Sequence, residues 1–97
     1  LVGAIAVHDV VGAGGTDTHI DFEIERVGAR GVFVDMLTSP CHIDTGERDT
    51  TTSGTAMVID AANDHVATGD VIWISVTTID TGTAPMGLVV IPLFQLP

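Results

Sequence analysis

The chain contains no lysine, and its only basic side chains are Arg26, Arg30 and Arg48. Thirteen acidic residues outnumber these three arginines and give a net charge of −10 with histidine neutral. Such a surface repels nucleic-acid phosphates and anionic lipids. We therefore expect neither a nucleic-acid partner nor a membrane partner.

Long apolar runs are also missing. No apolar stretch approaches the roughly 18 residues that span a membrane, and no charged segment with an apolar core marks a signal peptide. With 45% apolar residues, however, the chain has enough apolar surface for a folded core. We expect one domain, 1–97, whose N-terminus is incomplete through disorder or processing because it begins at Leu1.

Cysteine occurs once, so Cys41 cannot form a disulfide within the chain. A link between subunits and a buried, unreactive thiol are both possible for an odd cysteine, and the buried thiol is favoured. Aspartate far outnumbers glutamate. The acidity has two interpretations, ordinary solubility or adaptation to high salt, and the second predicts that screening by salt stabilises the fold.

Helical periodicity is absent, and short alternating runs broken by Gly, Thr, Asp and Pro favour an all-β fold. The segment 19–26 alternates most clearly, with Ile20, Phe22 and Ile24 on one side and polar residues on the other. We expect no helix longer than about two turns. The other expected strands are 1–7, 31–37, 55–59, 71–77 and 88–94, joined by loops or turns at 11–17, 27–30, 45–54 and 60–69, with a break at 38–40. Six or seven such strands predict a single antiparallel β-sandwich.

The last expected strand is apolar on both faces. One face, expected to pack inward, carries Leu88, Val90 and Phe94, and the opposite face carries Val89, Ile91 and Leu93. A strand with a solvated outer face should alternate with polar residues. We therefore expect the second face to contact another subunit or a larger shell, unless an upstream segment outside this sequence covers it. Pro92 cannot donate a ladder hydrogen bond, which predicts an edge strand or a bulge.

Histidines, carboxylates and serines are present, but they do not form a recognisable catalytic or metal-binding motif. The histidines lie beside acids in three places, which we interpret as loop-edge neighbours: His8-Asp9, His42-x-Asp44 and Asp64-His65. None of these pairs sets ligands on one helix face, and the serines lack the Gly-x-Ser-x-Gly turn of hydrolases. Calcium on loop carboxylates stays open, although the regular spacing is missing for Asp60, Asp64 and Asp70. We expect no catalytic residue, no metal, no cofactor and no enzymatic activity.

Trp73 is the only tryptophan, and it lies in the expected strand 71–77. It suits an interface anchor or a platform that stacks on a sugar. The alternative is an ordinary residue of the core or of a sheet face.

The C-terminal part of the chain resembles a known group of proteins. Gly69-Asp70 leads the strand 71–77, and Thr81-Gly-Thr-Ala-Pro-Met-Gly87 leads the strand 88–94. Upstream lie Ile43-Asp-Thr-Gly-Glu47, a Thr/Ser-rich stretch to Gly54, and Val58-Ile-Asp60. In the residues of these motifs and in their order, the segment 31–94 resembles small jelly-roll structural proteins of tailed bacteriophages and related archaeal viruses. One departure is that Leu37 runs almost directly to Cys41, where those proteins usually have a turn and a further strand.

The resemblance implies a jelly-roll β-sandwich on the outside of a virion, as a capsid decoration or cement protein. The partners expected from it are further copies of the chain, as a homotrimer, and the major capsid protein. The expected contact residues are Val89, Ile91, Leu93, Phe94 and Trp73. Two alternatives remain: a tail-fibre or receptor-binding module of a virion, and a sugar-binding or calcium-dependent accessory domain of an enzyme.

Overall fold

A computed structural model describes residues 1–10, 17–79 and 86–96. Within these ranges the only helical segment is a three-residue 3-10 turn, so the all-β prediction is confirmed. The elements are β1 (Gly3–Val10), β2 (Thr18–Glu25), β3 (Phe33–Asp35), β4 (Leu37–Ser39), β5 (Cys41–Ile43), η1 (Thr50–Thr52), β6 (Val58–Ile59), β7 (Val71–Thr78) and β8 (Met86–Leu93).

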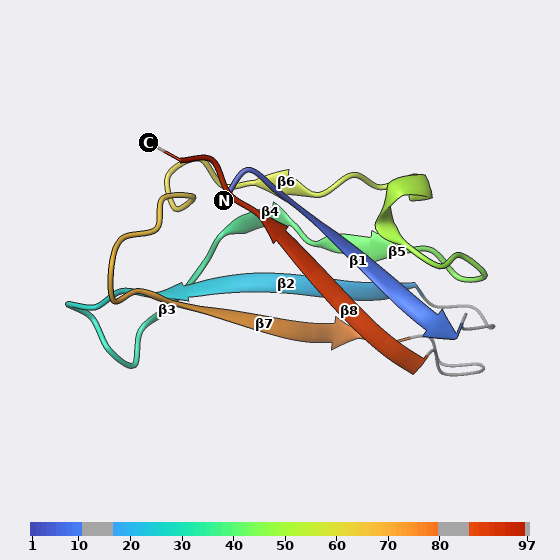
Figure 1. Ribbon diagram of the computed structural model, residues 1–97, viewed down its shortest axis with the longest axis horizontal. Helices are drawn as coiled ribbons and strands as arrows, with labels where there is room; N and C mark the ends of the chain where they lie inside the picture. The colour runs from blue at the N-terminus through green and yellow to red at the C-terminus, as the bar shows by residue number, and fades with distance from the viewer. Residues whose placement is uncertain (11–16, 80–85, 97) are drawn as a thin grey trace.

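The strands form a sandwich of antiparallel sheets. β2 is the centre of one layer: β7 pairs along its whole length on one edge, while β5 and β3 share the other edge. β1 and β8 form the second layer, which crosses the β2–β7 ribbon diagonally in Figure 1. β4 and β6 form a further short antiparallel pair. The two ends of the described chain lie close together at one end of the sandwich (Figure 1).

The core forms where the two layers face each other. β2 alternates between buried and half-buried residues, and its even positions supply Ile20, Phe22 and Ile24. Against them pack Ala6 from β1 and Leu88 and Val90 from β8. The rest of the buried apolar set is Leu1, Met36, Leu37, Cys41 and Ile43. Cys41 is buried as expected, and burial raises the pKa of its thiol.

The expected strand 31–37 is wrong in detail because the chain bends at Met36. Met36 is fully buried, and its amide and carbonyl bond to Phe22 and Asp60 rather than continuing one ladder. The chain therefore splits into β3 and β4, and the break expected at 38–40 falls instead within and after β4. β5 was not predicted, and the expected strand 55–59 shortens to β6. The loop expected at 11–17 lies outside the described residues except for Asp17.

The polar connection 45–54 is held by short side chains rather than by a core. Asp49 caps η1 by accepting hydrogen bonds from the amide and the hydroxyl of Thr51. Asp44 accepts from the Ser53 hydroxyl at 2.9 Å and from the Gly54 amide at 3.0 Å. These bonds lower the pKa of both carboxyl groups. Other contacts hold the connection to β1: the Ala6 amide donates to the Thr50 hydroxyl at 3.3 Å, and Asp49 bridges to Val7.

Candidate assembly interface

Six residues on the outer face of the β1–β8 pair form three cross-strand pairs, and all but Gly3 have apolar side chains. The antiparallel register sets Gly3 opposite Leu93, Ile5 opposite Ile91 and Val7 opposite Val89. Val89, Ile91 and Leu93 are 56%, 45% and 42% exposed. The alternate residues of both strands point the other way, into the core. We call these six residues the β1–β8 apolar face.

Sequence reasoning found half of this face and missed the β1 half. The signal was present, because the segment 1–7 is also apolar at every position apart from Gly3. Only the register shows that Ile5 and Val7 extend the row contributed by β8. Pro92 lies opposite Ala4, and among the described strands β8 pairs with β1 alone, so the predicted edge position is confirmed.

Phe94 does not pack inward as expected. β8 ends at Leu93, so the alternation stops there and the Phe94 side chain is about half exposed. It lines a shallow depression at the end of the sandwich where the two described termini meet. The residues of this depression are Leu1, His65, Val66, Phe94, Gln95 and Leu96.

Trp73 lies on the other side of the molecule from the β1–β8 apolar face. It is an outward residue of β7, opposite Glu23 of β2, and about half of its side chain is exposed. Its ring meets Phe33 edge to face at 5.6 Å between centroids, and its indole nitrogen lies 3.4 Å from a Glu25 carboxylate oxygen. The expected contact residues therefore fall into three separate places rather than one surface.

One edge of the core itself is poorly covered. Ile74 and Val76 of β7 lie opposite the buried Phe22 and Ile20, and therefore on the core side of the sheet. Each is nevertheless about half exposed. The diagonal second layer thus leaves part of the apolar side of β7 accessible.

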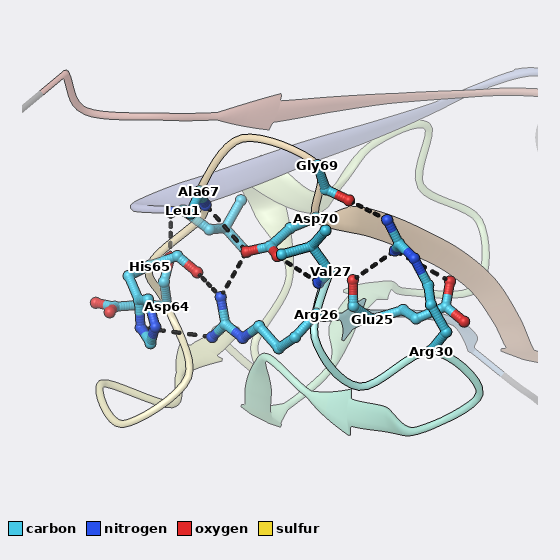
Figure 2. A network of polar contacts seen from close by, with 10 residues as sticks. All are labelled: Leu1, Glu25, Arg26, Val27, Arg30, Asp64, His65, Ala67, Gly69 and Asp70. Carbon is cyan, nitrogen blue, oxygen red and sulfur yellow. Dashed lines mark hydrogen bonds and ion pairs between the residues drawn. The ribbon is translucent and has the colours of Figure 1, made fainter.

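Figure 2 shows the polar network that ties the turn after β2 to the loop before β7. Asp70 accepts hydrogen bonds from the Val27 amide at 2.9 Å, the Ala67 amide at 3.0 Å and the Arg26 guanidinium at 3.0 Å. The amides of Ala67 and Val27, together with Arg26, lower the pKa of Asp70 to about 2. Gly69 before it has φ +90°, a conformation that favours glycine. Gly69 and Asp70 therefore have a structural role, joining the turn after β2 to the loop before β7.

Arg30 completes this network on the outside of the turn. Its guanidinium bonds the Gly69 carbonyl and lies 3.7 Å from the Glu25 carboxylate. Arg48 contacts the His8 carbonyl at 3.4 Å. All three arginines of the chain are thus engaged within the domain.

The histidines do not all lie at loop edges as expected. His8 belongs to β1 and is buried on its core side, because β1 continues past the predicted end at Val7. His42 belongs to β5 and lies directly opposite His19 of β2. Among the described residues, only one group brings three potential metal ligands within 4.8 Å of one another: Asp17, His19 and His42. Asp60, Asp64 and Asp70 form no such group within the same ranges.

Comparison with known proteins adds no relative. No protein-family model matches the chain, and neither a curated protein nor a solved structure matches it. No helix in the described part of the chain is long and apolar enough to cross a membrane.

Proposed function

We propose that this protein is a virion structural protein that decorates or cements the outer surface of a tailed-virus capsid. In this proposal a jelly-roll sandwich forms a homotrimer and contacts the major capsid protein. The β1–β8 apolar face carries the proposal, since five apolar side chains and Gly3 occupy positions where polar residues are expected on a solvated sheet face. The resemblance of residues 31–94 to small phage structural proteins supplies the viral setting.

The mechanism is physical rather than chemical. Covering a half-exposed Val, Ile or Leu contributes about 1 kcal/mol, roughly half the value for burying a whole side chain. One copy therefore binds weakly, and stability comes from summing many contacts over the assembled shell. Because such contacts exist only in the assembly, they raise the free energy needed to disrupt it.

The charge distribution supports contact through the apolar face. The outward side of β2 carries Asp21, Glu23 and Glu25, whereas the arginines are engaged within the domain. A strongly acidic surface keeps copies apart except where apolar area compensates for the repulsion. The partner surface in this proposal is accordingly apolar with a basic rim.

A second candidate is a tail-fibre or receptor-binding module. The observation that favours it is the exposed Trp73–Phe33 pair on the side away from the β1–β8 apolar face. Exposed aromatic rings anchor protein interfaces and stack on sugar rings. In this case the binding surface is the β3–β7 end of the sheet.

Replacement of Ile91 separates the two candidates. We expect Ile91→Asp to leave the isolated chain folded and to weaken trimerisation or capsid binding at least about tenfold, because a charge must then lose its water at the interface. Sedimentation velocity measures the oligomer, and co-sedimentation with capsids lacking this protein measures attachment. Val58→Asp is the matched control, since Val58 is 50% exposed and lies on β6, outside the face.

Three results would count against the capsid proposal. Unfolding of the Ile91→Asp monomer would make the residue part of the core. Equal attachment of the Ile91→Asp and Val58→Asp variants would remove the face from the interface. Loss of binding to host cells on Trp73→Ala, with capsid attachment unchanged in every variant, would instead support the receptor-binding module.

A further inference from the structure

Asp17, His19 and His42 form a compact cluster on the outward side of the sheet built on β2. Each residue offers one ligand atom, and these atoms all lie within 4.8 Å of one another. His19 and His42 are direct cross-strand partners, with ring centroids 3.9 Å apart and planes tilted by 45°. Asp17 lies one residue before β2, at the same end of the strand. The cluster is thus built by strand register.

The contacts within the cluster are incomplete. His42 Nδ1 is buried and has no hydrogen-bond partner among the described residues. The nearest carboxylate oxygen, Oδ2 of Asp17, is 3.9 Å away, too far for a hydrogen bond. A buried polar nitrogen without a partner costs free energy and calls for an explanation. An ion between the nitrogen and the oxygen would satisfy both.

The carboxylate is held in place from its other side. Asp17 Oδ1 accepts a hydrogen bond from the Thr45 amide at 3.0 Å, which turns the carboxylate toward His42. Hydrogen bonds of this kind orient ligands in known metal sites. A register shift between β2 and β7 falls between His19 and Ile20, beside the cluster. Such irregularities re-aim side chains and occur often beside functional sites.

We propose that Asp17, His19 and His42 bind one divalent transition-metal ion of the zinc class, with water in the fourth position. Two imidazoles and a carboxylate are a ligand set that suits zinc, copper and nickel better than calcium. In a tetrahedral site with bonds of about 2.0–2.2 Å, the donor atoms lie roughly 3.3–3.6 Å apart. The donors lie within 4.8 Å of one another and must therefore approach by up to about 1.5 Å, a shift within reach of side-chain rotation.

The protonation of His19 is compatible with this role. Burial and the neighbouring His42 lower the pKa of His19, while Asp17 opposes them. A lowered pKa keeps the ring unprotonated near neutral pH, as a metal ligand must be.

The proposed ion would join the start of β2 to β5 on the outside of the sandwich. The core residues lie on the opposite side of both strands, so we expect the fold to persist when the ion is removed. This inference departs from the expectation of no metal, because sequence spacing says nothing of a ligand set assembled across two strands. It is independent of the proposed function.

Titration of the purified protein with cobalt tests the site. Protein stripped with chelator is titrated with Co²⁺ alone, and Zn²⁺ is then added to displace it. We expect one equivalent of Co²⁺ with the visible absorption of a four-coordinate ion, and its loss on adding Zn²⁺. His19→Ala and His42→Ala should each lower the affinity more than about tenfold. His65→Ala is the matched control, because His65 lies beside Arg26, at the far end of β2.

Histidine side-chain NMR spectra of the wild type provide a measurement that needs no variant. Zn²⁺ should shift the ring nitrogens of His19 and His42 and leave those of His8 and His65 unchanged. The proposal is overturned by the absence of saturable Co²⁺ binding up to millimolar concentration. It is equally overturned by unchanged affinity in folded His42→Ala, or by zinc shifts confined to His8 or His65.

Discussion

The two layers of the sandwich differ in what they present to the outside. The layer built on β2 is apolar toward the core and carries Asp21, Glu23 and Glu25 outward. The β1–β8 layer is apolar toward the core and apolar outward, with Ile5 opposite Ile91 and Val7 opposite Val89. Both layers obey the same two-residue period of a strand. Periodicity alone therefore identifies a strand, and the chemistry of the outward positions indicates what the strand faces.

The outward faces of the two layers therefore differ in polarity and lie on opposite sides of the molecule. The acidic side carries the carboxylates of β2, the exposed Trp73–Phe33 pair and, at the start of β2, the histidine cluster. The β1–β8 apolar face is suited to a protein partner. Docking through the β1–β8 apolar face, as proposed, would leave the other layer hydrated.

The largest expected effect comes from comparing a core residue of β2 with a residue of the β1–β8 apolar face. Phe22→Ala empties a fully buried position and should lower the free energy of unfolding by about 3–5 kcal/mol. Ile91→Ala removes a side chain that is 45% exposed and should lower it by about 1 kcal/mol in the monomer. Urea unfolding at low protein concentration measures both values. A loss as large for Ile91→Ala as for Phe22→Ala would place the face inside a core.

How much of each strand the sequence predicts depends on the length of the strand rather than on its layer. β2, β7 and β8 were predicted nearly in full, because each presents eight residues of clear strand pattern. β5 was missed because three residues carry no measurable period, and the 31–37 strand was predicted unbroken because the bend at Met36 depends on contacts with distant residues.

The candidate sites show the same limit of sequence reasoning. Val89, Ile91 and Leu93 were found because they alternate within one strand. Ile5, Val7 and the cluster of Asp17, His19 and His42 required the register between strands, which no single segment encodes.

The second prediction concerns the buried histidine of the β1–β8 layer. Neither ring nitrogen of His8 has a hydrogen-bond partner in the described part of the chain, and burial lowers its pKa. Because the folded pKa lies below the unfolded value, protonation favours unfolding, and stability falls as the pH drops below about 6.5. His8→Leu should raise the free energy of unfolding by about 1–2 kcal/mol at neutral pH. The same substitution should also reduce the fall in the free energy of unfolding between about pH 7 and 5.5.

Urea unfolding at several pH values measures this effect. His19→Gln is the matched control, since the pKa of His19 is also lowered but its side chain lies on the outward face of β2. It should remove a smaller part of the decline. An unchanged pH dependence in His8→Leu would mean that His8 is not the buried titrating group.

The third prediction concerns the effect of salt on the stability of the acidic side. Glu23 and Asp35 are direct cross-strand partners of like charge on the acidic side, and such pairs destabilise a sheet. Molar NaCl should therefore raise the melting temperature by several degrees through screening. The double variant Glu23→Gln with Asp35→Asn should show a smaller rise. A melting temperature that is unchanged or lower in molar NaCl would remove the interpretation of salt adaptation.

The smallest expected effect concerns one carboxylate at the centre of the acidic side. Burial raises the pKa of Asp21, and nearby Asp35 adds to it, although the Phe22 amide donates to the carboxylate and opposes the shift. A raised folded pKa means that ionisation favours the unfolded chain, so the penalty is present at neutral pH and disappears as the pH falls below the unfolded value near 4.

Asp21→Asn keeps an oxygen that can accept from the Phe22 amide and removes the charge. It should stabilise the protein by up to about 0.5 kcal/mol at neutral pH and by nothing at about pH 3. Thermal unfolding at both pH values measures the difference, with Asp64→Asn on the loop before β7 as the control. A loss of stability at neutral pH would show that the Asp21 charge stabilises the layer and would contradict a raised pKa in the folded protein.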